Sequence, residues 1–208
     1  MHLLVTAGPT REPLDAVRYL SNRSSGTLGI AIANAAADAG HDATLLLGPV
    51  SQPLNLHKKV TLLRFETVSE LQTLLQEHFP SADALVMAAA VGDYRLAEPM
   101  PGKAERNKGD LTLKLTATPD LVSEVAKTKR DGQKVIAFAL EERDQLEARA
   151  RSKMQRKGVD AIVANPLETM DADDIEARFI SVDGAIQRLA SMSKADFATW
   201  LVRRLEAM

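Results

Sequence analysis

An unusual concentration of anion-binding and hydrogen-bonding side chains lies near the N-terminus of this 208-residue chain. It follows an apolar segment expected to form a strand, Leu3 to Thr6, and precedes an alanine-rich segment expected to form a helix, Thr27 to Ala39. The first N–H groups of a helix lack intrahelical acceptors, and the helix dipole favours negative charge there, so this order of elements predicts an anion site. The residues concerned are Arg11, Arg18, Asn22, Arg23, Ser24, Ser25 and Gly26.

Further charged residues fall in places that suit either ligand binding or simple solubility. Lys153 and Lys157 lie one turn apart in an expected helix and share a face with Arg149. They would bind an anion together, or pair with Glu147 on a solvated face. Asp93 follows a buried strand, where a carboxylate suits a strand-end cap, a metal ligand or a hydrogen-bond acceptor. A basic run in a polar insertion, too, would either bind a ligand or simply form a solvated surface: Lys103, Arg106 and Lys108.

Composition disfavours several classes of function. The chain has no cysteine, which excludes disulfides, thiolate metal sites and a cysteine nucleophile within it. Its formal charge of −2 gives no general field for nucleic acid or membrane binding. No apolar run is long enough to span a bilayer, so we expect a cytoplasmic protein. The histidines show no metal-ligand spacing, and we expect no metal site made of protein ligands: His2, His41, His57 and His78.

A nicotinamide site of the usual Rossmann type is disfavoured by two independent features. The glycine pattern G-x-G-x-x-G is absent, and Gly8 is followed by Pro9, which would block the close approach of a glycine turn. The second expected strand ends in Leu47-Gly48-Pro49 rather than in an acidic residue that would hold a ribose. A Walker P-loop is also missing, because no G-K-[ST] occurs.

Expected strands and helices alternate along the chain. The further strands cover Ala43 to Leu47, Val60 to Phe65, Ala84 to Ala90, Val135 to Ala139, Ala161 to Ala164 and Ala177 to Val182. The further helices cover Thr67 to His78, a segment capped at Thr118-Pro119-Asp120 that runs to about Lys129, Glu142 to Lys157, and Lys194 to Glu206 with Ser193 as cap.

This alternation predicts an α/β fold: a doubly wound, Rossmann-like, mostly parallel sheet in a single domain covering residues 1–208. The polar segment Val91 to Asp110 and the short strand Leu111 to Leu115 interrupt it and predict a flap or hairpin at about 91–115. Ligands bind beyond the carboxyl ends of parallel strands. We therefore expect the polar loops at Pro9 to Gly26, Val91 to Arg95, Leu140 to Glu142 and Asn165-Pro166 to meet at one cleft.

Motifs along nearly the whole chain resemble those of the phosphopantothenoylcysteine synthetases, the ligases of coenzyme A biosynthesis. The most specific is TAGPTREPLDAVRYLSNRSSGTLG, from Thr6 to Gly29. Further matches are Ala89 to Arg95, Gly102-Lys103, Leu111 to Leu115, Thr118 to Asp120, Phe138 to Glu141, Ala150 to Lys157, Asp160 and Ala164-Asn165.

The resemblance implies a two-step ligation. The carboxylate of phosphopantothenate attacks the α-phosphate of a nucleoside triphosphate, CTP in bacteria (or ATP), and the amine of cysteine then displaces the nucleotide from the acyl group. The family uses Mg²⁺ for the triphosphate and works as a homodimer. A stand-alone ligase would need a separate flavin-dependent decarboxylase for the next step.

Roles for individual residues also follow from the resemblance. Asn22 should stabilise the acyl phosphate with Arg18 nearby, and Lys103 on the flap should assist the second step. The nucleotide and its phosphates should be held by Ser24, Ser25, Gly26, Ala89, Asp93, Phe138, Lys153 and Lys157.

Departures from the family pattern leave alternatives. The flap reads Lys103-Ala-Glu105-Arg106 where the family has Lys-x-Lys-Lys, and Leu140, Pro166 and acidic Asp171 to Glu176 also differ. A ligase is the main interpretation. An NAD(P)-dependent Rossmann oxidoreductase and a diverged, non-catalytic nucleotide-binding protein are the alternatives.

Overall fold

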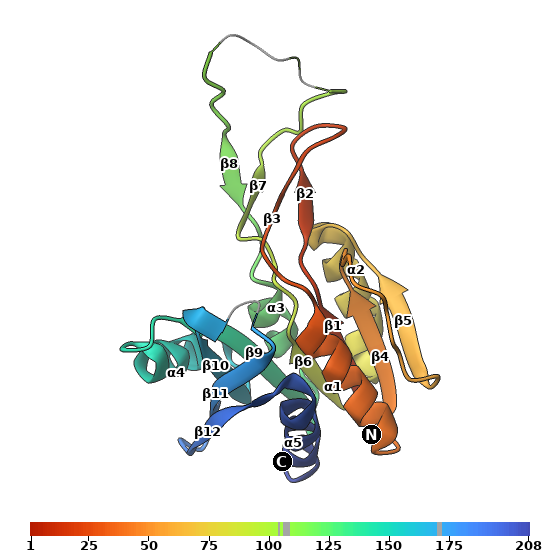
Figure 1. The fold of residues 1–208 in the computed structure, drawn as a ribbon, viewed down its shortest axis with the longest axis vertical. Coiled ribbons are helices and arrows are strands. Elements are labelled where there is room, and N and C mark those ends of the chain that lie inside the picture. The colour runs from red at the N-terminus through yellow and green to blue at the C-terminus, as the bar shows by residue number, and fades with distance from the viewer. Residues whose placement is uncertain (104, 106–108, 170–171) are drawn as a thin grey trace.

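The protein is built on a central sheet, seen in a computed structural model that describes residues 1–103, 105, 109–169 and 172–208. Within this part of the chain the sheet has eight strands in the order β12-β11-β10-β9-β6-β1-β4-β5 (Figure 1). The strands are β1 (His2–Ala7), β4 (Asp42–Leu47), β5 (Val60–Arg64), β6 (Ala84–Met87), β9 (Lys134–Glu141), β10 (Ala161–Pro166), β11 (Asp174–Ser181) and β12 (Ile186–Ser193). All neighbours from β5 to β10 are parallel, and β11 and β12 add an antiparallel edge.

The chain order reverses between β1 and β6. From β1 the chain winds outward through β4 to β5, and from β6 it winds the other way through β9 to β10. This is the topological switch point of a doubly wound sheet, where the loops after two neighbouring strands diverge and leave a crevice. The sheet therefore predicts a ligand site above the ends of β1 and β6.

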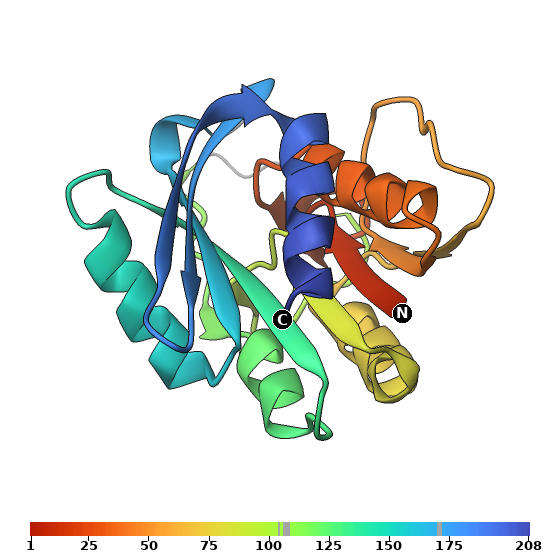
Figure 2. The same cartoon turned by 90° about the horizontal axis from the view of Figure 1, so that it is seen from below.

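Helices cover both faces of the sheet (Figure 2). On one face lie α1 (Thr27–Asp38) and α5 (Lys194–Glu206), and on the other α2 (Val68–His78), α3 (Leu121–Lys127) and α4 (Leu146–Lys157). Short 3₁₀ turns occur at Phe79–Ser81 and Leu167–Thr169. Among the described residues, no helix combines the length and apolar character needed to cross a membrane.

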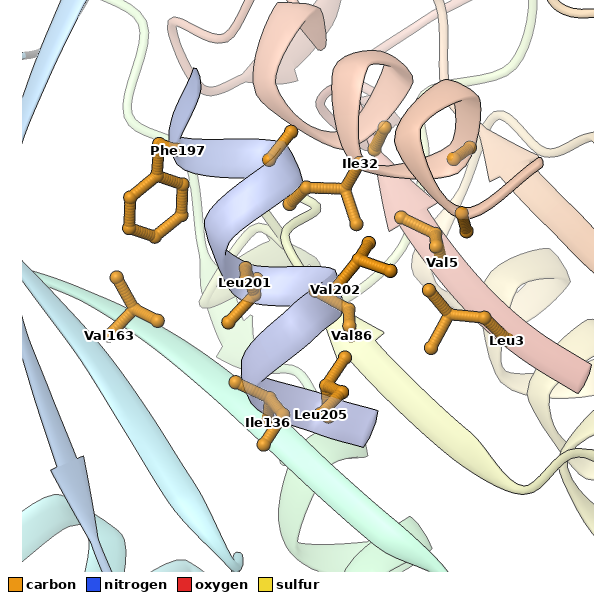
Figure 3. Packing of buried hydrophobic residues seen from close by; sticks show 14 of the residues in the cluster. Leu3, Val5, Ile32, Val86, Ile136, Val163, Phe197, Leu201, Val202 and Leu205 are labelled. Atoms are coloured by element: carbon orange, nitrogen blue, oxygen red, sulfur yellow. The ribbon is translucent and has the colours of Figure 1, made fainter. Parts of the chain in front are cut away.

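Two cores result from the alternation of side chains along the strands. Leu3 and Val5 of β1 face α1 and α5, whereas Leu4 between them faces the opposite layer. Figure 3 shows α5 placing its apolar residues against β6, β9 and β10 in the first core. Each fully buried Leu, Val or Phe side chain stabilises the fold by roughly 1.5–3 kcal/mol. This packing fixes the N-termini of α1 and α5 relative to the ends of the strands.

Two hairpins project together from the sheet (Figure 1). One pairs β2 (Arg11–Pro13) with β3 (Tyr19–Ser21), and the other pairs β7 (Tyr94–Leu96) with β8 (Leu115–Ala117). Their outer loops are joined, because the backbone N–H of Ala16 donates to the carbonyl oxygen of Gly102 at 2.9 Å. We call the described residues of the two hairpins and their loops (11–21, 94–103, 105 and 109–117) the arm.

Several sequence predictions are confirmed and some are wrong. The doubly wound sheet, the Thr67/Glu70 capping box and the Ser193 cap are confirmed. The α3 cap is Asp120 and not Thr118, because Asp120 accepts from the N–H of Ser123 while the Thr118 hydroxyl bonds the carbonyl of Gly92. Other errors concern bounds: β6 stops at Met87, α4 begins at Leu146, and only Leu115 of the expected strand 111–115 belongs to β8. The β7–β8 hairpin confirms the hairpin expected at about 91–115, but the strands β2, β3, β7 and β12 were not predicted individually.

Candidate functional site

A cavity of about 830 Å³ opens above the ends of the parallel strands, at the switch point between β1 and β6. Its walls come from the segment before α1, the loop after β6, the start of α3, the ends of β9 and β10, and α4. All four polar loops expected to converge contribute to it, so that prediction is confirmed. The cations on its wall (Arg23, Lys153, Arg156, Lys157 and Lys194) outnumber the carboxylates (Asp93 and Asp120), which favours an anionic ligand.

The N-terminus of α1 forms one wall of this cavity. Gly26 is its N-cap residue, with a left-handed φ of 75°, and has no side chain to cap the helix; Oγ of Ser25 accepts a long hydrogen bond, 3.4 Å, from the N–H of Thr27. A Cβ on Gly26 would lie 2.9 Å from Cγ1 of Val50, so only glycine fits. Gly29 brings the helix close to β1, because a Cβ there would lie 2.4 Å from Cβ of Ala7. The uncapped end of α1 is thus held at the cavity, as an anion site requires.

The loop after β6 is fixed opposite this helix end. The Asn22 side-chain amide donates to the backbone carbonyl oxygens of Ala90 at 3.4 Å and Val91 at 3.1 Å. The hydroxyl of Thr6 accepts from the N–H of Ala89 at 3.0 Å, and that of Thr10 accepts from the N–H of Gly92 at 2.9 Å. Asn22 therefore stands at a rigid junction between the loops after β1 and β6.

Two lysines of α4 enter the cavity already paired with carboxylates. Lys157 contacts both carboxylate oxygens of Asp120 at 2.7 Å, and Lys153 contacts the buried carboxylate of Glu141, which Arg149 also approaches at 3.4 Å. Burial raises the pKa of Asp120, but hydrogen bonds from Lys157 and Ser123 lower it by more, so the pKa lies below its ordinary value. These pairs hold the ammonium groups in place on the cavity wall.

The far end of the cavity is more apolar and carries an amide without a partner. Phe138 packs edge to face against Phe197, with ring centroids 6.4 Å apart. Asn165, only 8% exposed, lies beside Leu140 in the β9–β10 register, and its Oδ1 accepts no hydrogen bond from the described residues. Buried amide oxygens normally have a donor. An aromatic wall with a buried amide suits a flat, polar-edged group such as a nucleobase.

The structure brings most of the predicted site residues together. Asn22 and all the predicted nucleotide-binding residues line the cavity: Ser24, Ser25, Gly26, Ala89, Asp93, Phe138, Lys153 and Lys157. Arg18 and Lys103 do not; they lie in the arm, where Arg18 donates to Asp15 through Nε at 2.8 Å. Arg106 and Lys108 of the predicted basic run, and Asp171 of the acidic segment, lie outside the described residues.

Sequence reasoning missed several cavity residues, among them Arg156, Lys194 and the Asn165 side chain as a binding group. Lys194 is the first residue of α5, and the described part of the structure gives its ammonium no hydrogen-bond or ion-pair partner. A cation in a first helical turn is disfavoured by the helix dipole. This unfavourable position, visible in the sequence directly after the expected cap Ser193, could have indicated that Lys194 has a role in binding. No group of three or more His, Asp or Glu side chains arranged to hold a metal ion occurs among the described residues.

The fold and this cavity define a doubly wound α/β protein with a cation-rich cavity at the switch point of its sheet. The chain belongs to the family of the DNA/pantothenate metabolism flavoprotein C-terminal domain, which matches residues 1–208. A crystal structure of the C-terminal domain of the coenzyme A biosynthesis bifunctional protein CoaBC shares 30% identity and superimposes with a TM-score of 0.83, covering 100% of this chain and 94% of that one.

Two full-length relatives extend the comparison. The bifunctional protein CoaBC of Escherichia coli (strain K12) is 39% identical over 88% of this chain and 46% of its own length. A cysteine/cysteine sulfinic acid decarboxylase from an unknown prokaryotic organism is 33% identical over 98% of this chain and 57% of its own length. The chain thus spans about half the length of these curated relatives.

Proposed function

We propose that this protein joins phosphopantothenate to L-cysteine through an acyl-nucleotide intermediate, in the biosynthesis of coenzyme A. The observation that carries the proposal is the placement of Asn22 beside the uncapped N-terminus of α1, inside the cavity that also holds Lys153 and Lys157. The reaction forms a mixed anhydride between a carboxylate and a phosphate. It needs donors around phosphate oxygens rather than a protein nucleophile.

The proposal assigns each part of a nucleoside triphosphate to a part of the cavity. The phosphates would lie against Ser24, Ser25 and the first N–H groups of α1, with the lysines of α4 opposite. The base would lie against Phe138, with the Asn165 amide at its edge. An amide offers a donor and an acceptor, which matches the N3 and amino edge of cytosine, and we propose CTP as the preferred nucleotide.

A magnesium ion would accompany the triphosphate. Magnesium in such sites is usually held by one or two carboxylates together with substrate phosphates. Asp93 fits this requirement: it lines the cavity, and the described residues give its carboxylate no ion pair, unlike Asp120. Bound magnesium would neutralise charge on the phosphates, while Asn22 would orient the carboxylate that attacks.

We further propose that the protein is a homodimer joined through its arm. The arm projects away from the core and carries an exposed apolar surface, which we call the arm surface: Val17, Leu20, Tyr94, Leu111, Leu113 and Leu115. Exposed apolar patches of this kind mark interaction sites. A second copy would cover the arm surface, and it would also bring Arg18 and Lys103 to a cavity, since neither lines the cavity of its own chain.

The direct test is pyrophosphate release with phosphopantothenate and Mg²⁺, comparing CTP with ATP, with and without cysteine. We expect release with CTP that accelerates on adding cysteine, together with formation of the cysteine amide. A folded protein that releases no pyrophosphate with either nucleotide would contradict the proposal. Release that is equally fast with ATP would retain the ligase and remove the CTP preference.

A further inference from the structure

A second cavity, of about 460 Å³, lies on the other side of the segment from Ser21 to Ser25. Its wall includes Arg11 and Tyr19 from the arm and Val50 to Gln52 from the loop after β4. Asn22, Ser24 and Ser25 line both cavities, so this segment is a thin partition between them. The proposed nucleotide chemistry leaves this second cavity without a role.

Arg11 provides the second cavity with a fixed positive charge. Its guanidinium lies over the ring of Tyr19, with Cζ 4.4 Å from the ring centroid, and its backbone N–H donates to the carbonyl oxygen of Glu66 at 2.7 Å. No carboxylate among the described residues pairs with this guanidinium. A stacked, immobilised guanidinium is suited to bidentate binding of a carboxylate from a ligand.

The rest of the cavity suits a small amphipathic molecule. Gln52 is held in place, because its Nε2 donates to the carbonyl oxygen of Ser25 at 3.0 Å and its Oε1 accepts from the Thr27 hydroxyl at 3.1 Å. Val50 provides an apolar wall close to Gly8 and Gly26. A carboxylate at Arg11 and a short thiol-bearing side chain against Val50 would leave the amine of an amino acid directed at the partition.

We propose that the second cavity binds the α-amino acid acceptor, and that Arg11 binds its α-carboxylate. This inference rests on the proposed ligase function. The acyl phosphate lies at Asn22, which both cavities share, so the amine reaches the acyl carbon from the side opposite the nucleotide. The C–N bond forms, the bond between the acyl carbon and the phosphate oxygen breaks, the nucleoside monophosphate leaves with the electron pair, and the amine proton passes to water.

The experiment separates the two half-reactions in Arg11→Gln. Isotope exchange between pyrophosphate and CTP, measured with phosphopantothenate and without cysteine, reports only the first step. We expect it to remain within about twofold of the wild type, whereas the KM for cysteine rises roughly 10- to 100-fold, the effect of losing a charge-assisted hydrogen-bonded pair. Arg64→Gln, at the end of β5 and outside both cavities, is the matched control.

Cysteamine, which lacks the carboxylate, separates carboxylate binding from a purely structural role of Arg11. A structural defect alone would leave the ratio of kcat/KM for cysteine to that for cysteamine unchanged. The wild type should prefer cysteine over cysteamine in kcat/KM, and Arg11→Gln should lose most of that preference. Arg11→Lys, which keeps a positive charge, should retain part of it and serves if the glutamine variant does not fold. An unchanged preference in the variants overturns the proposal.

A second anion has to be distinguished, because the phosphate of phosphopantothenate would also bind a guanidinium. A rise in the KM for phosphopantothenate, together with loss of the exchange reaction in Arg11→Gln, would assign Arg11 to that phosphate and overturn the inference. Absence of exchange in the wild-type protein would instead contradict the ligase function itself.

Discussion

The side-chain amide of Asn22 donates to the carbonyl oxygen of Val91 at 3.1 Å, although the two residues are 69 positions apart in the chain. This bond joins the loop after β1 to the loop after β6, the two loops that diverge at the switch point of the sheet. It places a hydrogen-bond donor beside the uncapped end of α1, where the proposed acyl phosphate forms.

Asn22→Asp should abolish ligation while leaving the fold intact. The substitution replaces a donor by a negative charge, which faces two carbonyl oxygens and repels the phosphate. We expect kcat to fall by about 100-fold or more, the usual effect of removing a donor to a developing anion. The measurement is product formation beside a thermal melt; because Asn22 is exposed, the loss of its two hydrogen bonds should lower the melting temperature only slightly. Full activity would exclude the assigned role.

Gly29→Ala should destabilise the protein and weaken nucleotide binding together. The added Cβ would lie 2.4 Å from Cβ of Ala7 and 2.9 Å from the carbonyl oxygen of Thr6, so α1 must move away from β1. Such overpacking costs about 1–3 kcal/mol of unfolding free energy. Denaturant unfolding measures the cost. Gly109→Ala, where an added Cβ meets nothing within 4 Å, is the control and should behave as the wild type.

Lys194→Met should change stability and nucleotide affinity in opposite directions. Removing a cation from the first turn of α5 relieves its unfavourable position in the helix dipole, worth about 0.3–1 kcal/mol. The same change removes a cation from the cavity wall and should raise the Kd for the nucleotide several-fold. A thermal melt and a CTP titration test both effects. Equal CTP binding by variant and wild type would show that Lys194 does not contact the ligand.

Asp120→Asn should reveal a contribution to stability that depends on pH. The pKa of Asp120 is lowered in the folded state, so its pairing with Lys157 stabilises the fold above its ordinary pKa of 3.8 and is lost as the pH falls through the folded-state value. Asparagine also caps helices well, so the α3 cap is kept. At neutral pH the free energy of unfolding of the variant should lie at most about 1 kcal/mol below that of the wild type, because the pair is partly exposed to solvent. The difference should vanish in acid; a constant difference would mean that the ion pair is not its source.

Leu113→Ser combined with Val17→Ser should produce a monomer. Val17 is 62% exposed on the arm surface, and hydroxyl groups there would be desolvated in a dimer. Sedimentation velocity gives the oligomeric state, and ligation should fall with it if the partner supplies Arg18 and Lys103. Val182→Ser alters a residue that is 71% exposed outside the arm, and this variant should remain dimeric. A monomeric wild type would contradict the dimer.

The sheet and the main cavity could be predicted because local patterns agree with the tertiary structure. Buried parallel strands such as Ala84 to Met87 are apolar throughout, and polar side chains occur in the loops beyond several strand ends, as Asp93 does beyond β6. Since the ends of parallel strands meet at one edge of a sheet, residues as distant as Asn22 and Lys157 could be assigned to one cleft.

The hairpin at about 91–115 was predicted and is present as β7 and β8, but the β2–β3 hairpin and the edge strand β12 could not be predicted, for a physical reason. Strand β3 is exposed throughout and β12 has no fully buried residue, so neither shows the apolar alternation that marks a strand. The ion pair between Lys153 and Glu141 could not be predicted either, because it joins α4 to β9 and does not follow from any spacing within one element.

The hydrogen bond between Ala16 and Gly102 links two loops that are far apart in the chain. Arg18 follows the first loop closely and Lys103 is the next residue after Gly102. The two cations therefore lie on loops that are joined by backbone hydrogen bonds, so the position of one loop constrains that of the other. If Arg18 and Lys103 act on the substrate as proposed, the length of either loop would set the position of both charges, at a distance from the main cavity.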